Sequence, residues 1–137
     1  YLRALQLFEE IIGKRMEQQI KPIHSAKLAI RKLFEMVVFS DEETPPGCLI
    51  VNSAVELTLH DQEVADRISK SFSKTESFIY ELLLQGQMNG ELSDQLDLEK
   101  LAQSIHNSFI GIRVLAKTTN DKEKLQNIID STLAVLD

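Results

Sequence analysis

The sequence predicts an all-α fold: a helical bundle of about six helices that forms one domain over residues 1–137. Apolar residues recur with the 3.6-residue period of an amphipathic helix in six segments, and no segment shows the sustained alternation of a half-buried strand. With 43% hydrophobic and 26% charged residues, the composition is that of an ordinary globular domain. A chain of 137 residues is long enough to bury one core.

Three helices are expected in the first half of the chain, at about 1–19, 22–39 and 47–59. Pro22 lacks an amide N–H and disfavours helix at the residue before it, so we expect it to open the second helix. The segment 40–46, with three acids and two prolines, is expected to be a loop. The helix at 47–59 is apolar on most of its surface, which predicts a place inside the domain.

Three longer helices are expected in the second half. Asp61 is a good N-cap for a helix to residue 89, where Asn89 and Gly90 end it because Gly adopts a left-handed C-cap cheaply. A fifth helix begins after Asp97. Asn120 and Glu123 have the spacing of a capping box, so we expect Asn120 to cap the sixth.

The charge distribution argues against direct binding of nucleic acid. The net charge is −6, and the basic residues are interleaved with acids, so the surface repels a phosphate backbone on average. No window approaches the roughly 20 apolar residues of a membrane-spanning helix. Cys48 is the only cysteine and cannot form an internal disulfide, which fits a reducing compartment. We therefore expect a cytoplasmic protein without a membrane partner.

No constellation of residues predicts catalysis, a metal or a cofactor. There is no Gly-rich phosphate loop, nucleophile elbow or zinc motif, so we expect no enzyme. Glu56 and His60 are four residues apart, but a dedicated metal site needs three or four ligands. The three histidines lie on different expected elements, so nothing pairs a base with Cys48, and a buried structural cysteine is the favoured interpretation.

Two polar features leave alternatives open. Asn52 and Glu56 interrupt an apolar helix at i and i+4, either as residues paired with neighbouring groups or as the few polar contacts of an apolar pocket. His106 lies in the middle of the fifth helix beside Ile105 and Phe109. It is a satisfied core residue, a helix-interface residue or a pocket polar group, and the first two together are favoured over the third.

A resemblance to a known family covers nearly all of the chain. The stretch 46–57 (PGCLIVNSAVEL) resembles the GCLxxNxxxE segment of C-terminal domains of TetR/AcrR-type transcriptional regulators. The same order continues with Asn-Gly-Glu-Leu at 89–92 and Asp-x-x-x-Leu-Ala at 97–102. The resemblance implies a TetR C-terminal-domain-like bundle that binds a small-molecule effector and forms a homodimer. It also implies operator DNA binding through an N-terminal helix-turn-helix domain that this sequence lacks.

The expected mechanism is that of a repressor. Effector in a cavity would favour an arrangement of the dimer that no longer matches the operator. The start at Tyr1, already in helical spacing, indicates that a preceding segment has been removed or left out.

Helical period predicts which residues face inward and could line a ligand site. The ligand-binding candidates are Phe8, Ile12, Phe34, Val37, Cys48, Asn52, Val55, Phe72 and Phe109. The resemblance implies that the last two helices form a four-helix bundle with their counterparts in the dimer, and the stripe of small residues on the fifth helix is compatible with such close approach. The dimer-interface candidates are Ser104, Ser108, Gly111, Leu125, Ile128 and Thr132.

Two other functions compete with this hypothesis. A helical interaction module that only dimerises or binds a protein would have a filled core, whereas a sensor would have a hollow apolar cavity with a few polar groups. A helical-bundle enzyme would need paired carboxylates or metal ligands facing inward from several helices, and the sequence suggests none that is convincing.

Overall fold

The computed structural model describes residues 2–39, 54, 56 and 61–137, and these residues are helical wherever they form regular structure. The helices are α1 (Leu2–Gln19), α2 (Ala26–Val38), α4 (Gln62–Met88), α5 (Leu98–Thr118) and α6 (Lys122–Leu133), and α6 runs into the 3₁₀ turn η1 (Ala134–Leu136). The predicted all-α bundle is confirmed. The expected helix at 47–59 lies largely outside the described residues, of which Ala54 and Glu56 are helical.

The start of α2 differs from the prediction by four residues. Pro22 lies in a turn closed by the hydrogen bond from Ile23 N to Ile20 O at 2.9 Å, not in the helix. The helix begins after Ser25, whose hydroxyl accepts from Leu28 N at 3.2 Å. A serine that satisfies a free amide is a stronger start signal than a proline that only tolerates the first turn.

The predicted ends of α4 are confirmed. Asp61 caps its first turn by accepting from Val64 N at 3.2 Å. After Asn89 the chain turns at Gly90, whose φ of +83° is the left-handed conformation that favours glycine. α4 therefore spans 27 residues, the longest helix described.

The prediction for α5 is confirmed, whereas the predicted cap of α6 is wrong by one residue. Asp97 caps α5 by accepting from Lys100 N at 3.2 Å. Asp121, not Asn120, caps α6, accepting from Lys124 N at 3.0 Å. Both residue types are good caps, and the turn in which Asp121 N donates to Thr119 Oγ1 places the aspartate in the cap position.

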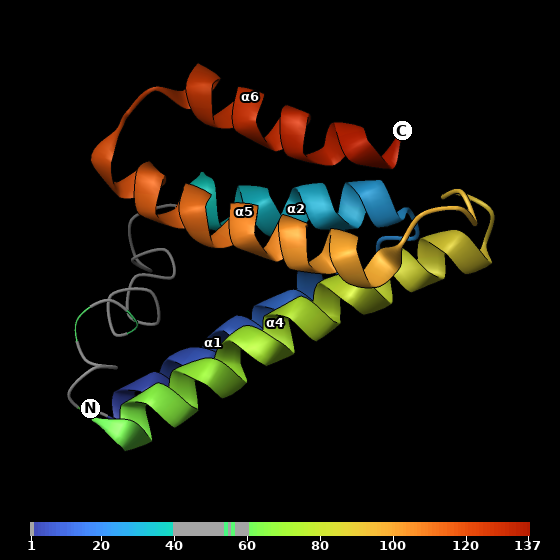
Figure 1. Cartoon of the computed structure of the whole chain (residues 1–137). Coiled ribbons are helices and arrows are strands. Elements are labelled where there is room, and N and C mark those ends of the chain that lie inside the picture. Colours follow the sequence, from blue (N-terminus) through green and yellow to red (C-terminus); the bar gives the residue numbers. More distant parts are fainter. Residues whose placement is uncertain (1, 40–53, 55, 57–60) are drawn as a thin grey trace.

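Helices α2, α5 and α6 lie roughly alongside one another, and the pair of α1 and α4 crosses them obliquely (Figure 1). The larger core cluster lies where α2, α5 and α6 meet the C-terminal half of α4. At its centre the rings of Phe34 and Phe109 meet edge to face, with centroids 5.3 Å apart. Arg31 pairs with Asp130 at 2.7 Å and Lys27 with Asp137 at 2.9 Å, so ion pairs join α2 to the C-terminal end of the chain.

The loop between α4 and α5 is fixed to the start of α2 by one carboxylate. Glu91 accepts hydrogen bonds from Ser25 Oγ at 2.6 Å, Ala26 N at 2.6 Å and Lys27 N at 3.1 Å. The same loop closes on α4 through Leu92 N, which donates to Gly86 O at 2.9 Å. Two of the otherwise unsatisfied amides at the start of α2 thus gain a charged acceptor from a distant loop.

A second, smaller core cluster joins the N-terminal ends of α1 and α4. Leu5 of α1 is buried against Val64 and Ile68 of α4, and Phe8 and Phe72 pack at its edge. The larger cluster holds the far end of α1 through Met16 and Ile20. The two helices are thus packed together near both ends of α1. Among the described residues, no helix has the length and hydropathy needed to cross a membrane.

Candidate functional site

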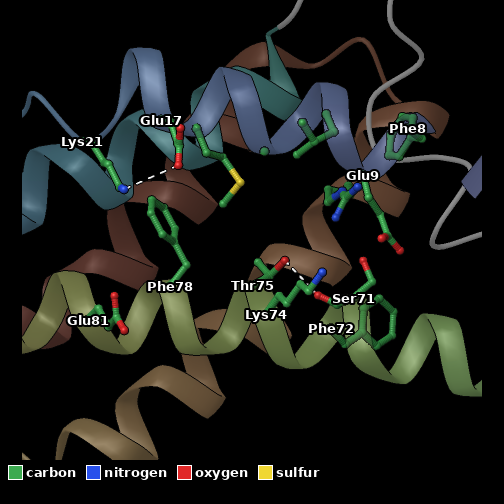
Figure 2. Close-up of a pocket in the computed structure, with 14 residues that line it drawn as sticks. Phe8, Glu9, Glu17, Lys21, Ser71, Phe72, Lys74, Thr75, Phe78 and Glu81 are labelled. Atoms are coloured by element: carbon green, nitrogen blue, oxygen red, sulfur yellow. Dashed lines mark hydrogen bonds and ion pairs between the residues drawn. The ribbon is translucent and has the colours of Figure 1, made fainter. Parts of the chain in front are cut away.

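A cavity of about 370 Å³, partly open to solvent, lies between α1 and α4, in the interval between the two core clusters. Its apolar surface comes from three phenyl rings, Ile12 and Met16 (Figure 2). Phe8 and Phe72 also edge the small cluster, whereas Met16 and Phe78 edge the large one. The lining residues are Phe8, Glu9, Ile12, Gly13, Met16, Glu17, Lys21, Ser71, Phe72, Lys74, Thr75, Phe78, Glu81 and Arg113.

Gly13 contributes to the width of this cavity. A Cβ built at Gly13 would meet no atom within 4 Å. Glycine in a helix interior costs roughly 1 kcal/mol relative to alanine, and here it leaves space open beside the aromatic rings. A larger side chain at this position would therefore enter the cavity.

Two glutamates of the cavity lining, Glu17 and Glu9, form ion pairs. Glu17 and Lys21 form an exposed ion pair, 3.6 Å apart, at one end (Figure 2). Towards the other end, Glu9 Oε2 lies 3.3 Å from Arg67 Nη2. Exposed pairs such as the first contribute little to stability, whereas the Glu9 side chain is only 15% exposed and is held in place.

Arg113 brings α5 into the cavity wall. Its guanidinium lies over the ring of Phe109, 5.1 Å from the centroid, and the residue is only 8% exposed. Phe109 in turn contacts Phe34 of α2, so the cation rests on the centre of the large core. A buried guanidinium at this place is a fixed polar group in an otherwise largely apolar cavity.

His106 lies between α4 and α5 and is 7% exposed. Its ring meets Phe72 edge to face at 5.6 Å, and Nδ1 is 3.8 Å from Glu76. Burial lowers the pKa of His106, the nearby Glu76 opposes this and Arg113 adds to it, so the net pKa lies below the ordinary value of a histidine. His106 is thus a helix-interface residue, and it also lines a shallow hollow together with Phe72 and Glu76.

Comparison with known proteins identifies the domain. A family model described as "Tetracyclin repressor-like, C-terminal domain" matches residues 29–132. The chain belongs to this family. The resemblance drawn from the segments at 46–57, 89–92 and 97–102 is thereby confirmed.

Two relatives are transcriptional regulators. The chain is 31% identical to the uncharacterized HTH-type transcriptional regulator YezE of Bacillus subtilis (strain 168), over 100% of the chain and 72% of YezE. It is 26% identical to the HTH-type transcriptional repressor ComR of Escherichia coli (strain K12), over 69% of the chain and 45% of ComR. The chain is thus a TetR-like regulatory domain, and its family and relatives are regulators, not enzymes.

In this TetR-like domain, the ligand-binding candidates fall into three groups. Phe8, Ile12 and Phe72 line the cavity. Phe34, Val37 and Phe109 are buried in the large core cluster and do not line it. Cys48, Asn52 and Val55 lie outside the described residues.

Several lining residues were missing from the candidate set. Met16 follows Phe8 and Ile12 at helical spacing, so the same stripe could have identified it. Glu9, Gly13 and Arg113 gave no such signal, because hydrophobic period does not select charged residues or glycine.

The dimer-interface candidates of this TetR-like domain differ in accessibility. Ser104 and Gly111 are exposed on α5, and Ser108, Ile128 and Thr132 are partly exposed. Leu125 is only 3% exposed and packs in the core of its own chain, so it supports α6 from within. The Thr132 hydroxyl donates to Ile128 O at 2.7 Å.

Proposed function

We propose that this chain is the effector-binding and dimerisation domain of a TetR-family transcriptional repressor. The observation that carries the proposal is the cavity between α1 and α4. Its volume of about 370 Å³ falls in the range of small-molecule sites, roughly 300–1,000 Å³, and three phenyl rings in its lining distinguish it from other surface hollows of similar volume. A module that only binds a partner through its surface has no need of such a space, and filling it would add dispersion contacts.

The lining fits a small and largely apolar effector. Three phenyl rings provide apolar contact area, and Glu9 and Arg113 are the inward charged groups of lowest exposure. Apolar walls supply affinity, and a few fixed polar groups select orientation.

The partner for dimerisation is a second copy of the chain, seated on α5 and α6. Ser104 and Gly111 are small, so another helix can approach the outer face of α5 closely. A Cβ at Gly111 would meet nothing within 4 Å. Val114 and Val135 are about half exposed on these two elements. Small residues beside exposed apolar ones suit close helix packing across a two-fold axis.

Control of DNA binding follows from where the cavity lies. α1 is one wall, and in the full-length regulator a helix-turn-helix domain preceding α1 would contact operator DNA in the cytoplasm. Effector that binds better when α1 and α4 are further apart shifts the dimer towards that arrangement. The free-energy difference between the two arrangements changes by the difference between the effector's binding free energies for them. In allosteric proteins this difference is typically about 1–3 kcal/mol.

The test is a cavity-filling substitution. Gly13→Leu places a side chain in the cavity and removes a helix-interior glycine, so the fold is retained. Ligand-detected NMR with a library of small amphiphiles is expected to find binders of the chain and of Gly13→Ala, but none of Gly13→Leu. A library that binds no variant, or binds Gly13→Leu equally well, would contradict the proposal.

A further inference from the structure

Two donor groups on α4 line the cavity without a partner in the described part of the chain. Lys74 makes no ion pair or hydrogen bond there. The Ser71 hydroxyl makes no hydrogen bond either, because Thr75 Oγ1 donates at 3.3 Å to the backbone oxygen of Ser71 and not to its side chain. Figure 2 shows both side chains on the face of α4 that is turned towards α1. Both can therefore donate to a molecule in the cavity.

Arg113 adds a second positive charge to the same cavity, from α5. An exposed lysine such as Lys74 is ordinarily satisfied by water, whereas Arg113 is only 8% exposed. Its guanidinium is held over the ring of Phe109, 5.1 Å from the centroid. An arginine stays charged at any pH at which a protein is folded, so this wall of the cavity carries a fixed cation.

The carboxylates of the lining do not offset these cations. Glu9 Oε2 lies 3.3 Å from Arg67 Nη2, and its other oxygen is buried and out of reach of an occupant. Glu17 is paired with Lys21 at 3.6 Å. Glu81 is exposed, where water screens its charge. The cavity thus presents more positive than negative charge to a bound molecule, although the whole chain has a net charge of −6.

From this arrangement we infer the chemistry of the effector's head group: it is a carboxylate, with Lys74 and Ser71 as its hydrogen-bond donors and Arg113 as the buried positive charge. The inference rests on the proposed effector site. Hydrogen bonds between ionised groups are roughly twice as strong as neutral ones, so a carboxylate gains more here than an amide or a hydroxyl. The body of the effector is apolar and packs against the three phenyl rings of the lining.

The test uses three probes with a common phenylethyl body: 3-phenylpropanoate, 3-phenylpropanamide and phenethylammonium. Binding to the 137-residue chain is measured by calorimetry at pH 7. The propanoate and the amide have nearly the same shape, so the ratio of their affinities reports the charge of the head group. We expect the propanoate to bind at least about tenfold more tightly than the amide, and the ammonium to bind most weakly.

Two lysines of α4 form a matched pair of variants. Lys74 lines the cavity, whereas Lys70, one turn earlier, is exposed and lines a shallow groove beside Leu2 and Gln6. Lys74→Glu and Lys70→Glu change the net charge equally at exposed positions, so both are expected to fold. We expect Lys74→Glu to weaken the propanoate about fivefold and to leave the amide within about twofold. Lys70→Glu should change neither affinity by more than about twofold.

Arg113→Gln tests the buried charge, and Arg113→Lys is its rescue. We expect Arg113→Gln to weaken the propanoate about tenfold or more, and Arg113→Lys to restore part of the loss. Because Arg113 is buried, the affinity for the neutral amide serves as the control that the cavity is intact. If Arg113→Gln loses the amide as well, the two lysine variants decide.

Each contrary outcome has a distinct meaning. Equal binding of the propanoate and the amide, tightest binding of the ammonium, or equal effects of Lys74→Glu and Lys70→Glu would overturn the carboxylate head while leaving the cavity as a ligand site. If none of the three probes binds, but amphiphiles of the library bind the chain and not Gly13→Leu, the head-group inference fails alone. If neither the probes nor the library bind, the inference and the proposed effector site are both contradicted.

Discussion

Glu91→Gln is the substitution with the clearest expected effect on stability. Glu91 accepts three hydrogen bonds at the start of α2, two of them from backbone amides. Glutamine keeps the size but has one acceptor oxygen and no charge. It therefore loses part of the hydrogen bonding and the favourable interaction of an anion with a helix N-terminus.

The magnitude follows from these two losses. Hydrogen bonds to charged groups contribute about 1.5–3 kcal/mol and neutral ones about 0.5–1.5 kcal/mol. The charge near the helix N-terminus adds about 0.3–1 kcal/mol. We expect Glu91→Gln to lower the free energy of unfolding by about 2 kcal/mol at pH 7.

The pH dependence gives a second signature. Burial raises the pKa of Glu91, but the hydrogen bonds from Ser25, Ala26 and Lys27 outweigh it and leave the net pKa below 4.5. A carboxyl group whose pKa is lower in the folded than in the unfolded state stabilises the fold at pH values above its unfolded-state pKa. This stabilisation is lost as the pH falls through the folded-state pKa. The difference in the free energy of unfolding between wild type and Glu91→Gln should therefore become smaller below pH 4.5.

The assay is urea unfolding monitored by circular dichroism at pH 7 and at pH 3.5, at one protein concentration. Glu10→Gln, on the exposed side of α1, is the control and is expected to fall within about 0.5 kcal/mol of wild type. Equal stability of wild type and Glu91→Gln at pH 7, or a stability difference that persists undiminished at pH 3.5, would show that the Glu91 carboxylate does not stabilise the start of α2.

Two glycine substitutions test packing within the chain and between chains. Gly86→Ala places a Cβ 2.7 Å from Ala26 Cβ and 2.9 Å from Leu92 Cδ1. We therefore expect the free energy of unfolding, measured in urea, to fall by about 1–3 kcal/mol. Unchanged stability would show that α2 and α4 can separate freely. Gly111→Ala meets no atom within the chain and should stabilise α5 by up to about 1 kcal/mol while weakening the proposed dimer. Sedimentation equilibrium measures the dimer, and an unchanged dissociation constant would place the interface away from Gly111.

The sequence allowed most helix boundaries to be predicted, because their signals are local. Asp61, Asp97 and Gly90 act within one turn of the residues they cap or end. The two errors arose where two signals compete within a few residues. Ser25 and Asp121 cap their helices, whereas the proline and asparagine that precede them do not.

The cavity was harder to predict than the helices. The 3.6-residue recurrence of apolar residues identifies the inward face of a helix, and by this criterion Phe8 and Phe34 are both inward-facing residues. Only the packing of α1 on α4 leaves Phe8 beside a space, while Phe34 is enclosed by the core. Glu9 pairs with Arg67 of α4, a contact between residues distant in sequence that no local pattern encodes. Arg113 lies over Phe109 of its own helix, and only the packing of α5 against α1 and α4 brings it into the cavity wall.

One measurement tests whether a ligand between α1 and α4 controls DNA binding. The full-length regulator is titrated, by fluorescence anisotropy, onto a DNA site selected from a random-sequence pool, with and without a compound that binds the cavity. We predict that the compound weakens DNA binding by about tenfold or more, and that Gly13→Leu binds DNA normally but does not respond to the compound. A compound that occupies the cavity and leaves DNA affinity unchanged would contradict the account.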